Sequence, residues 1–297
     1  MAPQACAPYT GAMNYQHAFH AGNHADVLKH VTVLAIADHL LRKDSPFFVL
    51  DTHGGRGRYQ LHGEESRKTG EAAGGVLKLM DAPRLPEVVE RYLKAVQADN
   101  EPGTLTTYPG SPLLLSRCLR EQDRLATYEF QSEEATALKT VMAGNSRVAV
   151  HQGDGYAGLR ASLPPKSGGQ KIGRGLVLID PPYEDQSAEY PRIVTACQEI
   201  LARWPQGMVA IWYPIKQRRT LQHFFRSCQK LPAKSALVAE LLIRPDDSPL
   251  RLNGSGMLIL NAPWQFDQVL APGLASLRAH LGETGASHRL EWLNAPA

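Results

Sequence analysis

The stretch GLVLIDPPY, residues 175–183, indicates the architecture of this chain. Its first part, Gly175–Ile179, is a short, unbroken apolar run, which is typical of a strand buried on both faces of a sheet. The next four residues include two prolines, which lack the N–H that a strand ladder needs. The stretch therefore predicts a buried strand whose end carries polar groups, at the edge where open α/β sheets bind ligands.

Further apolar runs of this kind are spread along the chain. They cover Phe47–Leu50, Leu125–Phe130, Arg147–His151 and Gly207–Trp212. Helix-length segments separate them, which predicts an α/β fold with a parallel sheet covered by helices on both faces. Near the end, Ala239–Ile243 and Gly256–Leu260 are joined by a loop with Pro, Asp, Asn and Gly, which predicts an antiparallel pair at the sheet edge.

Two parts of the chain fall outside this pattern. Residues 1–12 are rich in Ala, Pro and Gly and lack periodicity, so we predict a disordered extension. Strands 47–50 and 125–130 are more than 70 residues apart, although a crossover needs far fewer. We therefore predict that residues 58–107, whose apolar residues recur at helical spacing, form an inserted helical subdomain. The main domain then comprises residues 13–57 and 108–297.

Two local patterns complete the outline. Apolar residues recur at helical spacing from Asp26 onward, which predicts a helix that the Ser45-Pro46 pair ends. The stretch from Pro164 to Gly175 is rich in Gly, Lys and Arg, and we predict a mobile basic loop there.

The composition excludes several classes of protein. The 297 residues carry 32 Lys and Arg against 29 Asp and Glu, and a net charge of +3 does not by itself indicate a nucleic-acid binder. Residues 160–260 hold 14 of these basic residues and 8 of the acids, so they carry +6 and the rest −3. The sequence has no transmembrane-length apolar run and no C-x-x-C pair, and the residues at its start lead us to predict no secretory signal. We predict a cytoplasmic protein with free thiols, without membrane association.

The residues Asp180-Pro181-Pro182-Tyr183 carry a specific chemistry. The carboxylate of Asp180 and the carbonyls of the two prolines accept hydrogen bonds without competing donors. Such a pair of acceptors suits an exocyclic –NH2 group, whose lone pair it localises for attack on a methyl group. Tyr183 can stack on a planar base. The alternative is a strand terminator followed by a surface tyrosine.

Glycines and acids follow the other strands. Asp51-Thr52-His53-Gly54-Gly55-Arg56-Gly57 comes directly after the first strand, and its glycines permit a tight turn close to a ligand. The dinucleotide pattern G-x-G-x-x-G is absent, because residue 60 is Gln, which disfavours a nicotinamide or flavin cofactor. Asp51 before this turn suits S-adenosylmethionine, with Glu129 accepting from its ribose hydroxyls and Asp154 from its adenine amine. Singly, these acids are ordinary strand-end residues; together they favour a cofactor site.

The segment Tyr15–His24 contains three histidines. His20 and His24 are four residues apart, but a zinc site needs three or four ligands and no partner stands out nearby, so we predict no metal. A polar arm that packs over a ligand fits the segment better. Lys29 and His30 follow on the predicted helix, where the pattern alone favours a solvated face.

Several motifs together resemble a known family. They are YQHAFHAGNHADVLKH at 15–30, DTHGGRGRYQ at 51–60, YPGSP at 108–112, DPPY at 180–183, IWYP at 211–214 and GSGM at 254–257. In these motifs, over nearly the whole chain, the sequence resembles the bacterial 23S rRNA (adenine-N6)-methyltransferase J family. The resemblance implies a Rossmann-like class I S-adenosylmethionine-dependent methyltransferase with a small helical insertion, acting on adenine 2030 of protein-free 23S rRNA.

The resemblance also implies residue roles. It places His30, His53, Ser111, Glu129, Asp154, Gly155 and Asp180 on cofactor contacts, to which the glycine-rich turn adds Asp51 and Gly55. Asp180 is the implied catalytic acceptor, with Pro181 and Tyr183 beside it. Tyr15, His17, Lys29 and Tyr183 are the predicted substrate-side residues, on the assumption that an adenosine is extruded into the pocket. We further predict that basic residues of the 164–175 loop and of 216–219 hold phosphates.

Two alternatives share these motifs. A DNA adenine-N6 methyltransferase would use the same pocket, and the residues alone do not separate RNA from DNA. A catalytically silent RNA-binding relative predicts loss of the cofactor acids, whereas Asp51, Glu129, Asp154 and Asp180 are all present. The expected partner is 23S rRNA, and the expected state is a monomer.

Overall fold

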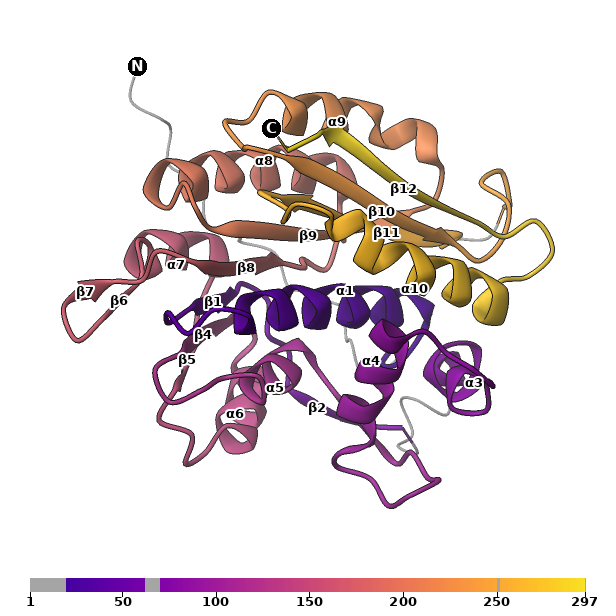
Figure 1. Ribbon diagram of the computed structural model, residues 1–297, viewed down its shortest axis with the longest axis horizontal. Helices are drawn as coiled ribbons and strands as arrows, with labels where there is room; N and C mark the ends of the chain where they lie inside the picture. Colours follow the sequence, from indigo (N-terminus) through magenta and orange to yellow (C-terminus); the bar gives the residue numbers. More distant parts are fainter. Residues whose placement is uncertain (1–19, 62–69, 250–251, 297) are drawn as a thin grey trace.

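The computed structural model describes residues 20–61, 70–249 and 252–296. Its main feature is an eight-stranded sheet, ordered β12-β10-β11-β9-β8-β1-β4-β5 (Figure 1). The strands are β1 Phe48–Asp51, β4 Arg124–Glu129, β5 Val148–Gln152, β8 Gly175–Ile179, β9 Met208–Ile215, β10 Ala236–Leu242, β11 Gly254–Leu260 and β12 Ser287–Asn294. From β5 to β9 the pairs are parallel, and β11, β10 and β12 pair antiparallel. The predicted parallel α/β sheet is confirmed.

Helices cover both faces of this sheet. One face carries α7 Gly155–Ser162, α8 Gln186–Arg203 and α9 Gln222–Gln229, with η3 Arg218–Leu221 before α9. The other carries α1 His24–Leu41, α5 Ser111–Ser116, α6 Ser132–Val141 and α10 Phe266–Leu281. Each face encloses its own apolar cluster, since the central strands are buried on both sides.

The segment between β1 and β4 adds a second helical layer outside α1. It contains η2 Glu71–Gly74, α3 Val76–Met80 and α4 Glu87–Gln97, framed by a short antiparallel pair of β2 Arg58–Gln60 with β3 Thr107–Pro109. Its buried Val89, Tyr92 and Val96 pack in the same cluster as α1. The helices expected there are present, and the boundaries of a separate subdomain stay a prediction.

The position of α1 between two layers corrects one expectation. The helix contacts β11 of the sheet, α5 and α10 on the same face of the sheet, and α4 of the outer layer. A helix covered all round must be buried all round, and Lys29 and His30 are 5% and 0% exposed. The solvated face that the local pattern favoured is therefore wrong, because the pattern does not reveal the second layer.

Two other local expectations differ from the structure. The pair β10 and β11 does not form the edge, because β12 adds outside β10. The stretch from Pro164 to Gly175 contains a two-stranded hairpin, β6 Lys166–Ser167 with β7 Gln170–Lys171, which projects from one end of the molecule (Figure 1). Because this hairpin precedes β8, it lies at the amino end of the parallel strands.

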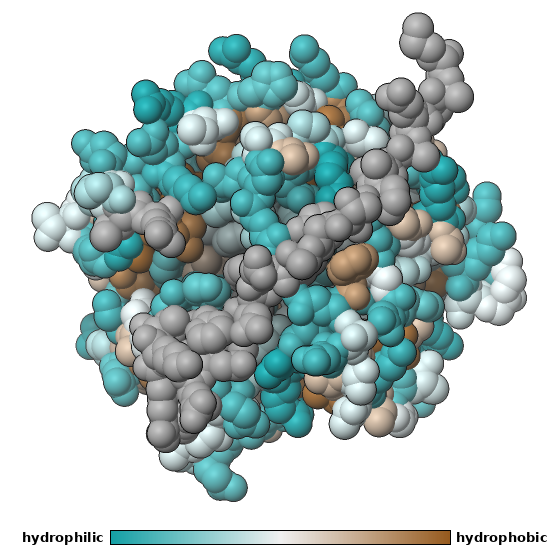
Figure 2. Space-filling view, turned by 180° about the vertical axis from the view of Figure 1, so that it is seen from behind, coloured by the Kyte–Doolittle hydropathy of each residue, from teal (hydrophilic) through white to brown (hydrophobic). Residues whose placement is uncertain are grey.

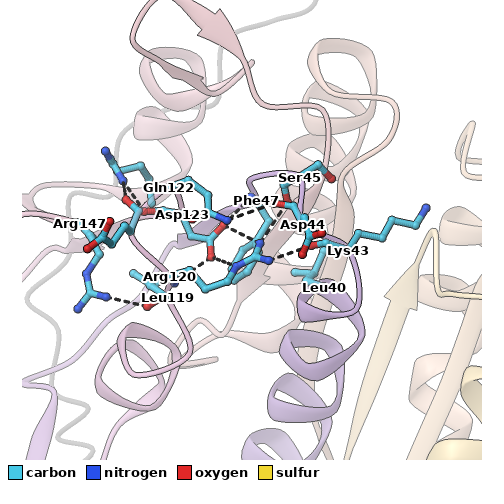
Figure 3. A network of polar contacts seen from close by, with 12 residues as sticks. Leu40, Lys43, Asp44, Ser45, Phe47, Leu119, Arg120, Gln122, Asp123 and Arg147 are labelled. Atoms are coloured by element: carbon cyan, nitrogen blue, oxygen red, sulfur yellow. Dashed lines mark hydrogen bonds and ion pairs between the residues drawn. The ribbon is translucent and has the colours of Figure 1, made fainter.

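Polar residues at this amino edge fasten α1 to the sheet (Figure 3). The buried carboxylate of Asp123 accepts from the Phe47 N–H at 2.9 Å and from the Arg120 Nε at 2.8 Å. The same Arg120 guanidinium donates to the carbonyls of Lys43 and Ser45, just after α1. This network fixes where β1 begins relative to the end of α1.

The surface has the character expected of a folded domain with its apolar residues inside. The face opposite to that of Figure 1 is predominantly hydrophilic (Figure 2). Among the described residues, none of the helices combines the length and the apolar character needed to cross a bilayer.

Replacing Asp123 by Ala should lower the free energy of unfolding by about 3 kcal/mol, because it leaves the buried Phe47 N–H without an acceptor and removes the carboxylate that pairs with the Arg120 guanidinium. Urea denaturation measures the change. The exposed neighbour Glu121→Ala is the control and should change stability by less than about 0.5 kcal/mol. Equal effects of the two substitutions would contradict the anchoring role.

Candidate active site

A cavity of about 270 Å³ lies at the carboxyl edge of the parallel strands. The predicted site residues that line it are Lys29, His30, His53, Gly55, Ser111, Glu129, Asp154, Gly155, Asp180, Pro181 and Tyr183. Asp51 is fully buried behind this lining. Tyr15 and His17 lie outside the described residues. The topology thus gathers eleven predicted residues from distant parts of the sequence around one cavity.

Asp180 holds a buried cation at the end of β8. The Lys29 Nζ lies 2.6 Å from the Asp180 Oδ2 and 2.9 Å from the Asp26 Oδ1. Burial lowers the pKa of Lys29, but the charges of Asp180 and Asp26 raise it well above its usual value, so the ammonium stays charged. Lys29 thereby fixes one oxygen of the Asp180 carboxylate.

Tyr183 adopts an uncommon backbone conformation, with φ of 52°. Its hydroxyl donates to the Trp212 carbonyl at 2.6 Å, and its ring packs against the rings of Tyr190 and Trp212. These contacts hold the ring as part of the cavity wall, with 7% of the residue exposed. The alternative of a surface tyrosine is therefore wrong, and Trp212, whose ring contacts that of Tyr183, also lines the cavity.

Glu129 is oriented by the glycine-rich turn after β1. It accepts the Gly55 N–H at 2.9 Å and the Gln131 N–H at 2.8 Å, one on each oxygen. Gly55 has φ of 59°, and a Cβ there would lie 2.2 Å from the Tyr59 hydroxyl, so a side chain is strained and crowded. Burial raises the pKa of Glu129. Each carboxylate oxygen retains a lone pair for a ligand hydroxyl.

Asp51 does not line the cavity but contacts two residues that do. Its carboxylate accepts from the Ser111 hydroxyl at 2.7 Å and from the His53 N–H at 3.2 Å. Burial raises the pKa of Asp51 to about 6, although these two hydrogen bonds oppose the shift. Asp51 therefore positions Ser111 and His53, which themselves line the cavity.

Asp154 and Gly155 form the start of α7. Asp154 accepts the Tyr156 N–H at 2.8 Å as a helix cap, and its other oxygen lies 3.5 Å from the Arg192 guanidinium. A Cβ on Gly155 would lie 2.0 Å from the Thr52 carbonyl, so this close approach of two loops requires glycine. The cap directs the Asp154 carboxylate to the cavity edge.

His30 connects the cavity to the segment between β1 and β4. Its Nδ1 lies 2.8 Å from the Tyr108 hydroxyl, which lies 3.0 Å from that of Tyr92 in α4. His20 and His24 do not share a site, because His20 pairs with Glu71 while His24 is buried. Within residues 20–61, 70–249 and 252–296, no three His, Cys, Asp or Glu side chains are grouped for a metal ion.

The comparisons with known proteins give the family of this chain. A family model described as ribosomal RNA large subunit methyltransferase D, RlmJ, matches residues 44–294. The chain belongs to the ribosomal RNA large subunit methyltransferase J family. The methyltransferase J proteins of Escherichia coli K12 and Haemophilus influenzae are each 38% identical to it, over 95% of this chain and 99% of theirs.

A solved structure supports the same assignment. The crystal structure of the Legionella pneumophila protein LPL1258 is 32% identical, covers 92% of this chain and 98% of its own, and superimposes with a TM-score of 0.82. The predicted family, the Rossmann-like fold class and the predicted type of enzyme, an rRNA methyltransferase, are therefore confirmed at the level of the methyltransferase J family. The roles of single residues stay predictions.

Sequence reasoning missed several lining residues in this member of the methyltransferase J family. Asp26, from which the helical spacing begins, is three positions before Lys29 and pairs with it. Arg192 of α8 lies over the Tyr156 ring at 5.0 Å and lines the cavity. Its i, i+3 spacing from Glu189 was the available pattern, but nothing local indicated that this turn of α8 faces the cavity.

Asp51 predicts a pH dependence of stability. The pKa of the Asp51 carboxyl is about 6 in the folded state and about 3.9 in the unfolded state. The folded state therefore binds the Asp51 proton more tightly, so the wild type loses stability as the pH rises from about 4 to about 6. The Asp51→Asn variant does not lose this stability, because Asn does not titrate. The difference in unfolding free energy, variant minus wild type, should rise by about 3 kcal/mol from pH 3 to pH 7 in urea denaturation. A difference that stays constant over this range would contradict the raised pKa.

Proposed function

We propose that this chain transfers a methyl group from S-adenosylmethionine to the exocyclic N6 amine of an adenine in 23S rRNA, adenine 2030 by family resemblance. One observation carries the proposal. The acceptor residues Asp180 and Pro181 line the same cavity as the strand-end carboxylates of Glu129 and Asp154. The hydrogen-bond acceptors suited to an amine and those suited to a nucleoside therefore line the same cavity.

The residues present fit the cofactor. Glu129 is oriented by two backbone N–H groups and offers both oxygens to a ribose diol. Asp154 offers an acceptor to an adenine amine, and Gly55 and Gly155 permit the close approaches of the chain to Tyr59 and to Thr52 that bring these loops together at the cavity. When bound, S-adenosylmethionine supplies an electrophilic methyl group. The protein contributes the in-line positioning of the two reactants.

At the amine, the chain supplies acceptors rather than a strong base. Lys29 holds the Asp180 Oδ2, so we propose that the Oδ1 and the Pro181 carbonyl accept the two amine hydrogens. Both interactions draw the nitrogen lone pair out of conjugation. Tyr183 and Trp212 supply the aromatic surface against which the extruded base packs. After transfer, the proton leaves to Asp180 or to solvent.

The RNA backbone is proposed to lie on the rim next to β9. Lys216 and Arg219 follow the carboxyl end of β9 and are exposed, and Lys216 lines the cavity. The 164–175 hairpin is at the opposite end of β8, and its Arg174 donates to the carbonyls of Lys43 and Ser45. The rim is therefore the better phosphate site. Protein-free RNA as substrate, a monomeric state and a cytoplasmic location complete the proposal.

Transfer of labelled methyl from S-adenosylmethionine to protein-free 23S rRNA tests the function, with duplex DNA as the competing substrate. Label on RNA, mapped to N6 of adenine 2030, is expected. Label on duplex DNA alone would favour the DNA alternative, and no label on either would favour the silent RNA-binding alternative.

Asp180→Ala should lower the transfer rate by at least about 10³-fold, because it removes an acceptor aimed at the developing charge. Thermal unfolding should show a folded protein. Asp185→Ala is the matched control: Asp185 is five residues away, caps α8 and is absent from the cavity lining. Full activity of Asp180→Ala would exclude the proposed role.

Lys216→Ala should raise the KM for RNA about three- to tenfold and reduce the slope of log affinity against log salt by about 1, since one phosphate contact is lost. The control is Lys171→Ala on the distant hairpin, which removes the same charge from an exposed site. If the control changes the slope and Lys216→Ala does not, the RNA lies along the other edge.

A further inference from the structure

The amino end of α1 is held by the helical segment between β1 and β4. The Val76 N–H donates to the Gly22 carbonyl at 2.9 Å. A Cβ on Gly75 would lie 2.1 Å from that same carbonyl oxygen, and Gly22 itself has φ of 78°. The two backbones therefore meet at a distance that only glycines permit.

Glu71, in η2, completes this contact with its side chain. One carboxylate oxygen lies 2.9 Å from the His20 Nδ1, and the other accepts from the Asn23 Nδ2 at 2.8 Å. The Asn23 Oδ1 in turn accepts the N–H groups of Ala25 and Asp26, so Asn23 is the amino-terminal cap of α1. Glu71 thus orients the cap of the helix that carries Lys29.

A continuous set of polar contacts leads from this cap to the reaction centre. Asp26 accepts the Gly22 N–H with its Oδ2 at 2.9 Å and pairs with Lys29 through its Oδ1 at 2.9 Å. The Lys29 Nζ then binds Asp180 at 2.6 Å. Asp26 and the Lys29 ammonium are buried, and Asp180 is only partly exposed at the cavity, so small displacements of this ion pair change large energies.

We propose that Glu71 is a positioning residue for methyl transfer, acting through the Asn23 cap, Asp26 and Lys29 on the orientation of Asp180. The proposal rests on the proposed function. Glu71 is absent from the cavity lining, so it acts without touching substrate or cofactor. The segment between β1 and β4 thereby helps to assemble the active site.

Glu71→Ala should lower kcat about tenfold and leave the dissociation constant for S-adenosylmethionine within twofold, because Glu129 and Asp154, the predicted cofactor carboxylates, are on other elements. Glu71→Gln at pH 8 should keep kcat within twofold of wild type, since Gln retains an acceptor for Asn23 and can donate to a neutral His20. Glu90→Ala, which removes an exposed ion pair with Lys94 in the same segment, should have no effect.

A second variant separates positioning from folding. Asn23→Ser keeps a residue that caps helices well but breaks the contact with Glu71. It should lower kcat as Glu71→Ala does, with an unchanged thermal midpoint. In a Lys29→Met background, Glu71→Ala should cause no further loss of kcat, because the two residues act in one chain of contacts.

A readout independent of activity follows Lys29 itself. In the wild type its buried, paired ammonium should resist acylation, measured by mass spectrometry relative to Lys94, whose side chain is 78% exposed. Glu71→Ala should raise this relative rate about fivefold or more. An unchanged rate, or equal loss of kcat in the Lys29→Met background, would overturn the proposal. An inactive wild type would contradict the proposed function while leaving the labelling result valid.

Discussion

The ammonium of Lys29, buried between the carboxylates of Asp26 and Asp180, links the two ends of the active site. A charge in the interior is tolerated only when it is paired, and here two carboxylates meet it at 2.9 and 2.6 Å. The pairing requires α1 to lie across the sheet with its first turns at the end of β8. The position of α1, the strand order and the orientation of Asp180 are thus parts of one constraint.

The rest of the site is arranged around this ion pair by backbone geometry. Glu129 is the last residue of β4 and Asp154 lies just after β5, and each is oriented by main-chain N–H groups. Glycines at 55 and 155 are needed where two loops or a ring approach closely. The predicted cofactor carboxylates, Glu129 and Asp154, are therefore preorganised by elements that the sheet itself positions, whereas the orientation of Asp180 depends on α1.

The charge of the chain is explained by the same geometry. The excess of basic residues between 160 and 260 is divided by the sheet, since the hairpin around Lys171 lies at the amino end of β8 and Lys216 lies beyond the carboxyl end of β9. Only the second group borders the cavity. A count of charges along the sequence does not distinguish these two positions.

The local sequence determined the buried strands, the acids at their ends and the turn after β1, because strand burial and strand-end polarity are encoded in a few consecutive residues. These features were enough to predict the fold class and the carboxylates of Glu129, Asp154 and Asp180 that line the cavity. The tertiary structure alone decided the burial of Lys29 and His30, the Lys29–Asp180 pair across 151 positions, the aromatic contacts of Tyr183 and the place of β12 at the sheet edge. The physical reason is that helical periodicity reports one packed face, whereas the covering of α1 by α4 and α10 depends on contacts between segments far apart in the chain.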